Sequence, residues 1–272
     1  MLSPMLKLLT ALLLLAFAFS SHSAELTLQG ELTQGSLIRG KLSNGSQLSL
    51  NDKPVALSSN GHFAFGFNRD AELKHKLTWL DEQGKPHSKD LVISSREYDI
   101  QRIEGVAGKY VSPPPEVTER IRQDNAQIGK ARQNNDDRID FMQDFIWPAE
   151  GPISGVYGSQ RVFNGTPKNP HFGLDVAGPT GTPVYAPADG IVTLYVSDMY
   201  YSGGTMVIDH GLGVSSTFLH LSAAEVEQGT VVKQGQLVAR IGATGRVTGA
   251  HLDWRINWFG ERLDPALLVP KR

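Results

Sequence analysis

The sequence contains no cysteine among its 272 residues. This absence excludes a disulfide framework and a lipid anchor attached to a cysteine. An excess of positive charge is also missing, because 26 Lys and Arg stand against 28 Asp and Glu, for a net charge of −2. We therefore expect no nucleic-acid partner. A chain of this length can form two modest domains, held together by their hydrophobic cores and by a metal ion if one is bound.

Residues 1–24 differ in kind from the rest of the chain. Lys7 precedes the apolar run LLTALLLLAFAF, and the small polar residues SSHSA follow it. This order is typical of a secretory signal peptide, and the apolar run is short for a membrane span. We predict cleavage between Ala18 and Ala24, with Ala24 favoured, and a periplasmic or cell-envelope location. A retained N-terminal anchor is the alternative.

Residues 25–108 are predicted to form an antiparallel, immunoglobulin-like β-sandwich. Short strand-like runs such as GHFAFGF, KLTWL and DLVIS are separated by turn signals. The pairs Asn44-Gly45 and Asn60-Gly61 are typical of hairpin turns. The histidines of this region are scattered, so we assign them to surface or packing positions; they are His62, His75 and His87.

Residues 109–146 are predicted to be a helical linker that starts after Pro113-Pro114-Pro115. Apolar residues recur there at helical spacing, namely Val117, Ile121, Ile128 and Ala131. The stretch from Asn134 to Asp137 interrupts the pattern, so a second helical piece is expected around Ile139 to Phe145. We expect the linker to connect the domains and to cover part of one. A partner-binding helix is the alternative.

Residues 147–272 are predicted to form an all-β domain. Strand-length runs are bounded by Gly or Pro, as in PVYAPADGIVTLYV, GTMVIDH, GVSSTFLHL and QGQLVARIG. The last of these resembles the hairpin of biotinyl or lipoyl carrier domains. Lys233 lacks the flanking residues of a modified lysine, so we attribute that similarity to a shared barrel architecture. The sequence assigns no oligomeric state.

Candidate metal ligands lie in this C-terminal half. The motif HFGLD places His171 and Asp175 four residues apart, and a histidine with a carboxylate suits a divalent ion such as zinc. In TFLHL, His220 is predicted to lie on a strand, on the same face as Phe218 and Ser216. Each side chain alone could bond locally, but their concentration in one domain favours a shared site.

The segment HLDWR follows a run of glycines that allows the backbone to turn closely toward such a site. If it is a strand, His251, Asp253 and Arg255 share one face, and Leu252 and Trp254 share the other. The segment therefore adds a histidine and a second acid to the candidate site.

Taken in order, HFGLD, APADGIVTLYV, VIDHG, TFLHL and GATGRVTGAHLD resemble the motif blocks of lysostaphin-type (LytM-like) zinc metallopeptidases. The preceding IWPAEGPISGVYGSQRVFNG resembles the lead-in of that family, and the similarity extends from about Gly155 to Leu268. It implies an antiparallel two-sheet peptidase domain with its site in a groove across one sheet. It also implies a secreted zinc endopeptidase that hydrolyses peptide bonds of peptidoglycan stem peptides or cross-links.

The resemblance implies roles for individual residues. His171, Asp175 and position 253 would hold one zinc ion, and His220 and His251 would be catalytic. Zinc with three protein ligands keeps a position for a water and lowers its pKa, while one histidine acts as general base and the other stabilises the oxyanion. His210, in VIDHGLG, also matches a family block, and its place before a glycine turn favours a packing role.

Asp253 departs from the family pattern, in which HxH supplies a histidine at this position. Three interpretations remain open: Asp253 is a ligand, Asp253 pairs with Arg255 and the metal site is incomplete, or the domain is degenerate. A degenerate domain would bind peptidoglycan and regulate another cell-wall hydrolase or a divisome-type partner. We favour the ligand, because the other four site residues are all present.

Overall fold

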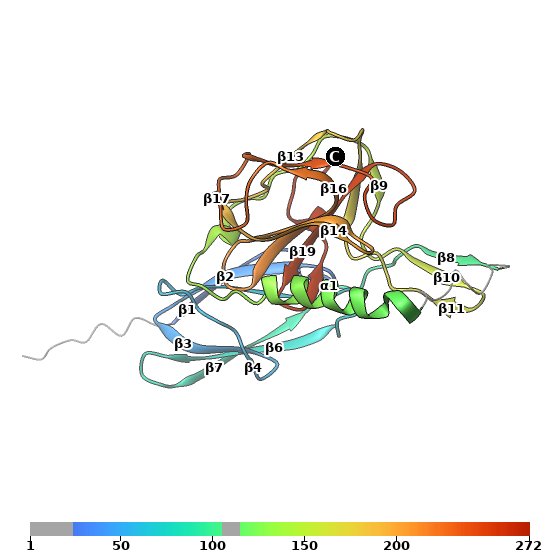
Figure 1. Cartoon of the computed structure of the whole chain (residues 1–272). Coiled ribbons are helices and arrows are strands. Elements are labelled where there is room, and N and C mark those ends of the chain that lie inside the picture. The colour runs from blue at the N-terminus through green and yellow to red at the C-terminus, as the bar shows by residue number, and fades with distance from the viewer. Residues whose placement is uncertain (1–23, 105–114) are drawn as a thin grey trace, which may run out of the picture.

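The computed structural model describes residues 24–104 and 115–272 (Figure 1). The predicted signal peptide and Pro113-Pro114 lie outside the described residues. The fold is mainly β, as predicted, with one α-helix and three short 3₁₀ helices in the part of the chain described. No helix in these two ranges is both long and apolar enough to span a membrane.

The N-terminal half consists of two antiparallel sheets, ordered β1-β2-β5 and β4-β3-β6-β7. Buried side chains from both sheets form one cluster that includes Ile38, Phe65, Leu77 and Leu91. This arrangement is the predicted β-sandwich. Its strands are β1 (Glu25–Gln29), β2 (Leu37–Ser43), β3 (Gly45–Leu50), β4 (Lys53–Pro54), β5 (His62–Gly66), β6 (Lys74–Asp81) and β7 (Pro86–Val92).

The predicted hairpin turns of the sandwich are wrong. Asn44-Gly45 links β2 to β3, and Asn60-Gly61 lies between β4 and β5, so each pair connects strands of different sheets. Both pairs still turn the chain, with φ of 55° at Asn44 and 79° at Gly61. The β3–β4 hairpin is closed by Asn51-Asp52, with φ of 49° and 63°. No turn was predicted at this pair. The sequence predicts turns at Asn44-Gly45 and Asn60-Gly61, but which strands these turns connect depends on the two-sheet core.

The C-terminal half is built on a ten-stranded sheet with the path β17-β14-β15-β16-β19-β12-β9. Strand β16 pairs with β19 up to Leu219 and with β18 from Leu221 onward, so it joins two layers. Its ten strands are β9 (Ile153–Gly155), β12 (Leu174–Ala177), β13 (Pro183–Tyr185), β14 (Gly190–Met199), β15 (Gly203–Asp209), β16 (Val214–Ala224), β17 (Val231–Val232), β18 (Leu237–Ile241), β19 (His251–Trp258) and β20 (Glu261–Leu263). Two further strands, β10 (Gln160–Phe163) and β11 (Thr166–Pro167), belong to a separate three-stranded sheet.

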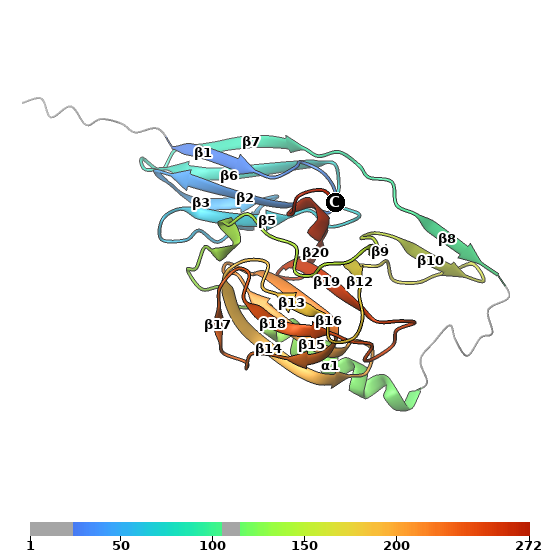
Figure 2. The ribbon, with the colours of Figure 1, turned by 90° about the horizontal axis from the view of Figure 1, so that it is seen from above.

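The two faces of this sheet are covered differently (Figure 2). On one face, β13 and β18 pack over β14 to β16, with Val184, Val238, Met206 and Phe218 in one buried cluster. On the other face, α1 (Thr118–Ala131) places Ile128 and Ala131 against Leu194 and Val207. The predicted amphipathic helix therefore covers part of the C-terminal half.

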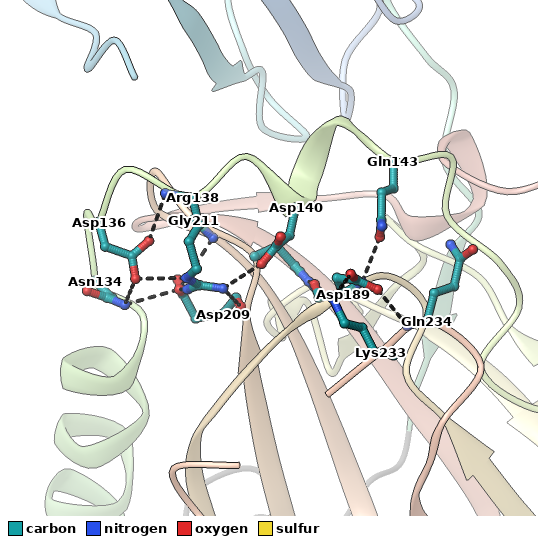
Figure 3. A network of polar contacts seen from close by, with 11 residues as sticks. Asn134, Asp136, Arg138, Asp140, Gln143, Asp189, Asp209, Gly211, Lys233 and Gln234 are labelled. Carbon is teal, nitrogen blue, oxygen red and sulfur yellow. Dashed lines mark hydrogen bonds and ion pairs between the residues drawn. The ribbon is translucent and has the colours of Figure 1, made fainter. Parts of the chain in front are cut away.

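The segment after α1 is fixed to the C-terminal half by the ion pairs in Figure 3. Arg138 donates to the carboxylates of Asp136, Asp140 and Asp209, the last at the end of β15. The predicted second helical piece is a single 3₁₀ turn, η3 (Asp140–Met142). Another 3₁₀ turn, η2 (Pro115–Val117), precedes α1, and η4 (Pro265–Leu267) follows β20.

The two halves share contacts across the boundaries predicted from the sequence. Leu37 of β2 and Ala64 of β5 belong to the same buried cluster as Leu263 of β20. Arg96 and Asp264 form an ion pair of 2.8 Å. Strand β8 (Ile100–Ile103) leaves the sandwich and pairs in parallel with β10 of the C-terminal half. The sandwich is therefore packed against the domain that carries the candidate site.

Candidate metal centre

Two carboxylates lie directly opposite each other where β12 pairs with β19. Asp175 faces Asp253 in the register of these antiparallel strands. Like charges in opposite positions destabilise a strand pair, so positive charge is needed between or beside them. His251 and Arg255 lie on the same face of β19 as Asp253, while Leu252 and Trp254 are fully buried beneath, as predicted.

His171 completes a compact set of donor atoms. It precedes β12, and its Nε2 lies 3.2 Å from Oδ1 of Asp175. Ligand atoms of His171, Asp175 and Asp253 all lie within 4.8 Å of one another. His171 Nε2 and Asp175 Oδ1 are buried, and apart from their own 3.2 Å contact neither has a hydrogen-bond partner. Buried polar atoms without partners are rare in native proteins, and a zinc ion bound by one histidine and carboxylates would satisfy both atoms.

Neighbouring charges act on His171. Burial disfavours its charged form, but the contact with Asp175 and the charges of Asp253 and Asp175 outweigh burial and raise the pKa of His171. The acids therefore make this corner of the site strongly attractive to a cation.

Two glycines leave room for the carboxylates. A Cβ at Gly155 would lie 2.2 Å from Oδ2 of Asp175, and a Cβ at Gly173 would lie 2.2 Å from Oδ1 of Asp253. Any side chain at these positions would displace the acids. Both the β9 position and the HFGLD position therefore require glycine.

Asp253 also forms a bidentate pair with Arg255. Nε of Arg255 donates to Oδ1 at 2.9 Å, and Nη2 donates to Oδ2 at 2.6 Å. Burial acts to raise the pKa of Asp253, which is only 3 % exposed, but the charge and hydrogen bonds of Arg255 hold that pKa below its usual value. A carboxylate has about four lone-pair sites. The ion pair and a metal contact can therefore coexist on Asp253.

His220 reaches this site through a break in β16. Regular alternation predicts that it shares a face with Phe218 and Ser216, and that prediction is wrong. Its φ is 64°, and the strand changes partner from β19 to β18 at this position. Such irregularities redirect side chains. The imidazole of His220 consequently lies beside that of His251, with ring centroids 4.8 Å apart.

The backbone fixes the tautomers of both histidines. Nδ1 of His220 lies 2.9 Å from the carbonyl oxygen of Thr244, and Nδ1 of His251 lies 2.9 Å from that of Gly249. A carbonyl only accepts, so both Nδ1 atoms carry hydrogen, and in the neutral form of each ring Nε2 is the acceptor. Burial lowers the pKa of His220, which favours its neutral form. Nε2 of His251 lies 3.8 Å from Oδ1 of Asp175, so this pair borders the candidate metal site.

Three other histidines, His75, His87 and His210, are engaged elsewhere. His210 is fully buried, with Nδ1 on the carbonyl oxygen of Asp189 at 2.6 Å and Nε2 on Oγ of Ser216 at 2.8 Å. Both of its nitrogens are used, as its predicted packing role requires. In the sandwich, His75 bonds Asn51 and His87 bonds Asp81.

Two arginines beside the site were not identified from the sequence. Arg132, which follows α1, donates to Oγ1 of Thr217 on β16, and Arg262 of β20 lies over the ring of Phe172 at 4.2 Å. No local motif marks either residue, since their proximity to Arg255 comes from the packing of α1 and β20.

Comparison with known proteins agrees with this geometry. Residues 169–265 match Peptidase family M23. The peptidoglycan DD-endopeptidase ShyA of Vibrio cholerae is 33 % identical over 193 residues, covering 66 % of this chain and 44 % of ShyA. The DD-carboxypeptidase/endopeptidase Mpg of Neisseria meningitidis is 40 % identical over 95 residues, covering 35 % of this chain and 22 % of Mpg. The chain thus spans less than half the length of these curated relatives.

A solved structure extends the similarity beyond this region. The crystal structure of a candidate peptidase M23 from Pseudomonas aeruginosa superposes with a TM-score of 0.67 at 27 % identity, covering 88 % of this chain and 95 % of that one. The superposition therefore includes the sandwich as well as the strands of the site. The strand order, the donor set and the sequence match together identify residues 169–265 as a LytM-like domain of peptidase family M23.

Proposed function

We propose that this protein is a zinc-dependent endopeptidase that hydrolyses peptide bonds of peptidoglycan. The observation that carries the proposal is the pair of buried atoms His171 Nε2 and Asp175 Oδ1, which have no hydrogen-bond partner beyond each other and lie next to Asp253. The relative named as a peptidoglycan DD-endopeptidase, ShyA, supports the substrate class. The leader predicted for residues 1–24 would deliver the protein to the cell envelope, where this substrate lies.

His171, Asp175 and Asp253 would hold the ion, which would polarise the scissile carbonyl and activate a water. Nε2 of His220 or His251 would accept the proton of the attacking water, because the hydrogen bond at Nδ1 leaves Nε2 of each neutral ring as an acceptor at the edge of the site. The other histidine, once protonated, would donate to the oxyanion that develops on the substrate. The backbone carbonyls that hold both rings fix their orientation before substrate binds.

Arg255 would compensate for the acidic third ligand. Two carboxylates cancel the charge of a divalent ion, which weakens its Lewis acidity. The guanidinium bound to Asp253 restores one net positive charge to the site. A divalent ion held by one carboxylate and two neutral histidines, as in the family pattern, has the same net charge. The Asp253–Arg255 pair would therefore act electrostatically like the histidine that the family pattern has at this position.

Incubation of the purified protein with purified peptidoglycan tests the proposal. We expect release of soluble muropeptides and about one zinc per chain. His220→Ala and His251→Ala should each lose turnover by at least about a hundredfold and keep both the fold and the metal. His171→Ala should lose the metal while the sandwich remains folded.

A regulatory role without turnover would give the opposite pattern. The protein would release nothing alone, would increase release by a separate cell-wall hydrolase, and would keep that effect in the His220→Ala variant. This pattern would replace the proposed function.

A further inference from the structure

Three arginines share the sheet face beside the proposed metal ligands. Thr217 of β16 lies opposite Arg255 of β19, and Arg132 donates to the hydroxyl of Thr217 at 2.8 Å. Asn257, two residues beyond Arg255, lies opposite Arg262 of β20. Directly opposed residues point to the same face, so Arg132, Arg255 and Arg262 gather next to Asp253.

Two of these arginines have no acidic partner. Within residues 24–104 and 115–272, Arg255 forms an ion pair with Asp253, whereas neither Arg132 nor Arg262 forms an ion pair. Burial together with the charges of Arg255 and Arg262 lowers the pKa of Arg132 to about 9. Positive charge therefore exceeds negative charge around the guanidinium groups, and an anion would relieve their repulsion.

The cluster is accessible from solvent and has free donors. Arg262 is exposed, and 27 % of the Arg255 side chain is exposed. Asp253 accepts from Nε and Nη2 of Arg255, which leaves Nη1 for another acceptor. The ring of Phe172 supports the guanidinium of Arg262 from one side. Phe172 directly follows His171, so this donor group lies next to the proposed metal site.

We propose that Arg132, Arg255 and Arg262 form a subsite for a free carboxylate of the peptide substrate. This inference rests on the proposed function, because a peptide bound across the ligands would place a nearby carboxylate on this cluster. Guanidinium groups match the planar carboxylate with paired hydrogen bonds. The site would thus select peptide bonds that have a carboxylate a short distance away and would discriminate against amidated peptides.

Binding to the full-length His220→Ala variant, which is expected to lose turnover and to keep the metal, tests the subsite. The probes are diacetyl-Lys-D-Ala-D-Ala and the same peptide with a C-terminal amide, titrated by calorimetry or by NMR. We expect the carboxylate form to bind at least about tenfold more tightly than the amide, because a charge-assisted hydrogen bond is lost in the amide. Equal affinities, or no binding of the carboxylate form, would overturn the subsite.

Charge-removing variants in the same background locate the binding. Arg262→Gln and Arg132→Gln should each reduce the preference for the carboxylate by about tenfold. Arg122→Gln is the matched control, since Arg122 is 70 % exposed on α1 and pairs with Glu119, and it should leave the preference unchanged. Arg262 is exposed, so its variant remains informative if Arg132→Gln does not fold.

An unchanged preference in Arg262→Gln would exclude the cluster as the binding site. The binding measurements do not depend on turnover. If the protein hydrolyses nothing but prefers the carboxylate, the subsite is supported and the proposed function fails. If the enzyme is active but binds both peptides equally, the proposed function is supported and the subsite fails.

Discussion

At the scale of the residue, Asp253 is the position on which the metal site depends. Its oxygens accept three hydrogen bonds from Arg255, and it also lies within 4.8 Å of the donor atoms of His171 and Asp175. The pair with Arg255 is satisfied without a metal, whereas His171 and Asp175 are not. The ligand role and the ion-pair role of Asp253 can be separated by mutating each partner in turn.

Asp253→Ala should therefore lose metal, and Arg255→Gln should retain it. Removal of the carboxylate takes one ligand atom from the metal, whereas removal of the guanidinium takes away a neighbouring positive charge. Metal content by mass spectrometry of the purified full-length proteins is the measurement. Normal zinc in Asp253→Ala together with loss in Arg255→Gln would contradict the ligand role.

Asp253→His tests the compensation by Arg255. The single variant restores the family's HxH but leaves Arg255 unpaired beside a divalent ion. We expect it to bind zinc at least about tenfold more weakly than the double variant Asp253→His/Arg255→Gln, because the uncompensated charge repels the ion. Competition with a chromophoric chelator measures both affinities. Equal affinities would show that Arg255 has no electrostatic role at the metal.

At the scale of the element, β16 carries strain at His220. A residue with φ of 64° is in the left-handed region, where a side chain costs about 1 kcal/mol that glycine avoids. The change of strand partner at this position directs the imidazole into the site. The element is thus less stable than a regular strand but places a functional group on the required face.

His220→Gly should consequently be more stable than His220→Ala by about 1 kcal/mol, although neither variant should hydrolyse peptidoglycan. Urea denaturation gives both free energies of unfolding. The matched control is Ser215, in the same strand and without a positive φ, where Gly should be less stable than Ala. The same order at both positions would argue against strain at His220.

At the scale of the whole molecule, the sandwich and the C-terminal half share a core. Leu37 of the sandwich is 2 % exposed and lies in the cluster that contains Leu263 and most of the C-terminal core. Burial of apolar surface across the boundary couples the two halves, so they should unfold together.

Leu37→Ala should destabilise both halves by about 2–4 kcal/mol. Trp258 packs against the cores of both halves, so it is replaced as well. In a Trp79→Phe/Trp258→Phe background the remaining tryptophans, Trp147 and Trp254, report on the C-terminal half. The fluorescence transition should shift with the mutation. Leu73→Ala, at a leucine that is 41 % exposed, should shift it little. A C-terminal transition that is unchanged by Leu37→Ala would mean that the two halves unfold independently.

The stability of the whole molecule should also depend on pH through His210. Burial lowers the pKa of His210 to about 4 from 6.5, so between these values the unfolded state binds the extra proton. The free energy of unfolding therefore falls as the pH is lowered from about 6.5 to about 4, by about 3 kcal/mol from this group. Burial raises the pKa of Asp209 to about 6, and that group contributes with the opposite sign in the same range.

His210→Gln should remove the contribution of the imidazole. Between pH 7 and pH 4 this variant should lose about 3 kcal/mol less stability than the wild type, as measured by urea denaturation at each pH. Ser216→Ala keeps the buried imidazole but removes its partner at Nε2, and it should keep the pH dependence. Parallel curves for His210→Gln and the wild type would contradict the assignment.

The sequence by itself determined the features that are local along the chain. Alternation of side chains in HLDWR places Asp253 and Arg255 on one face of β19, and the spacing in HFGLD places His171 and Asp175 together. The apolar spacing from Val117 to Ala131 predicted α1 in the same way. Periodicity follows from backbone geometry, so these relations hold before any long-range contact forms.

Only the tertiary structure decided which distant segments meet. The Asn-Gly pairs turn the chain, but the two-sheet core determined that they cross between sheets. His220 faces the site because β16 changes partners there, which alternation within TFLHL does not predict. Arg132 reaches Arg255 because α1 packs on that face of the sheet, and Arg262 reaches it because β20 pairs with β19. Strand pairing and side-chain packing are long-range interactions, whose free energy depends on the whole core and not on neighbouring residues.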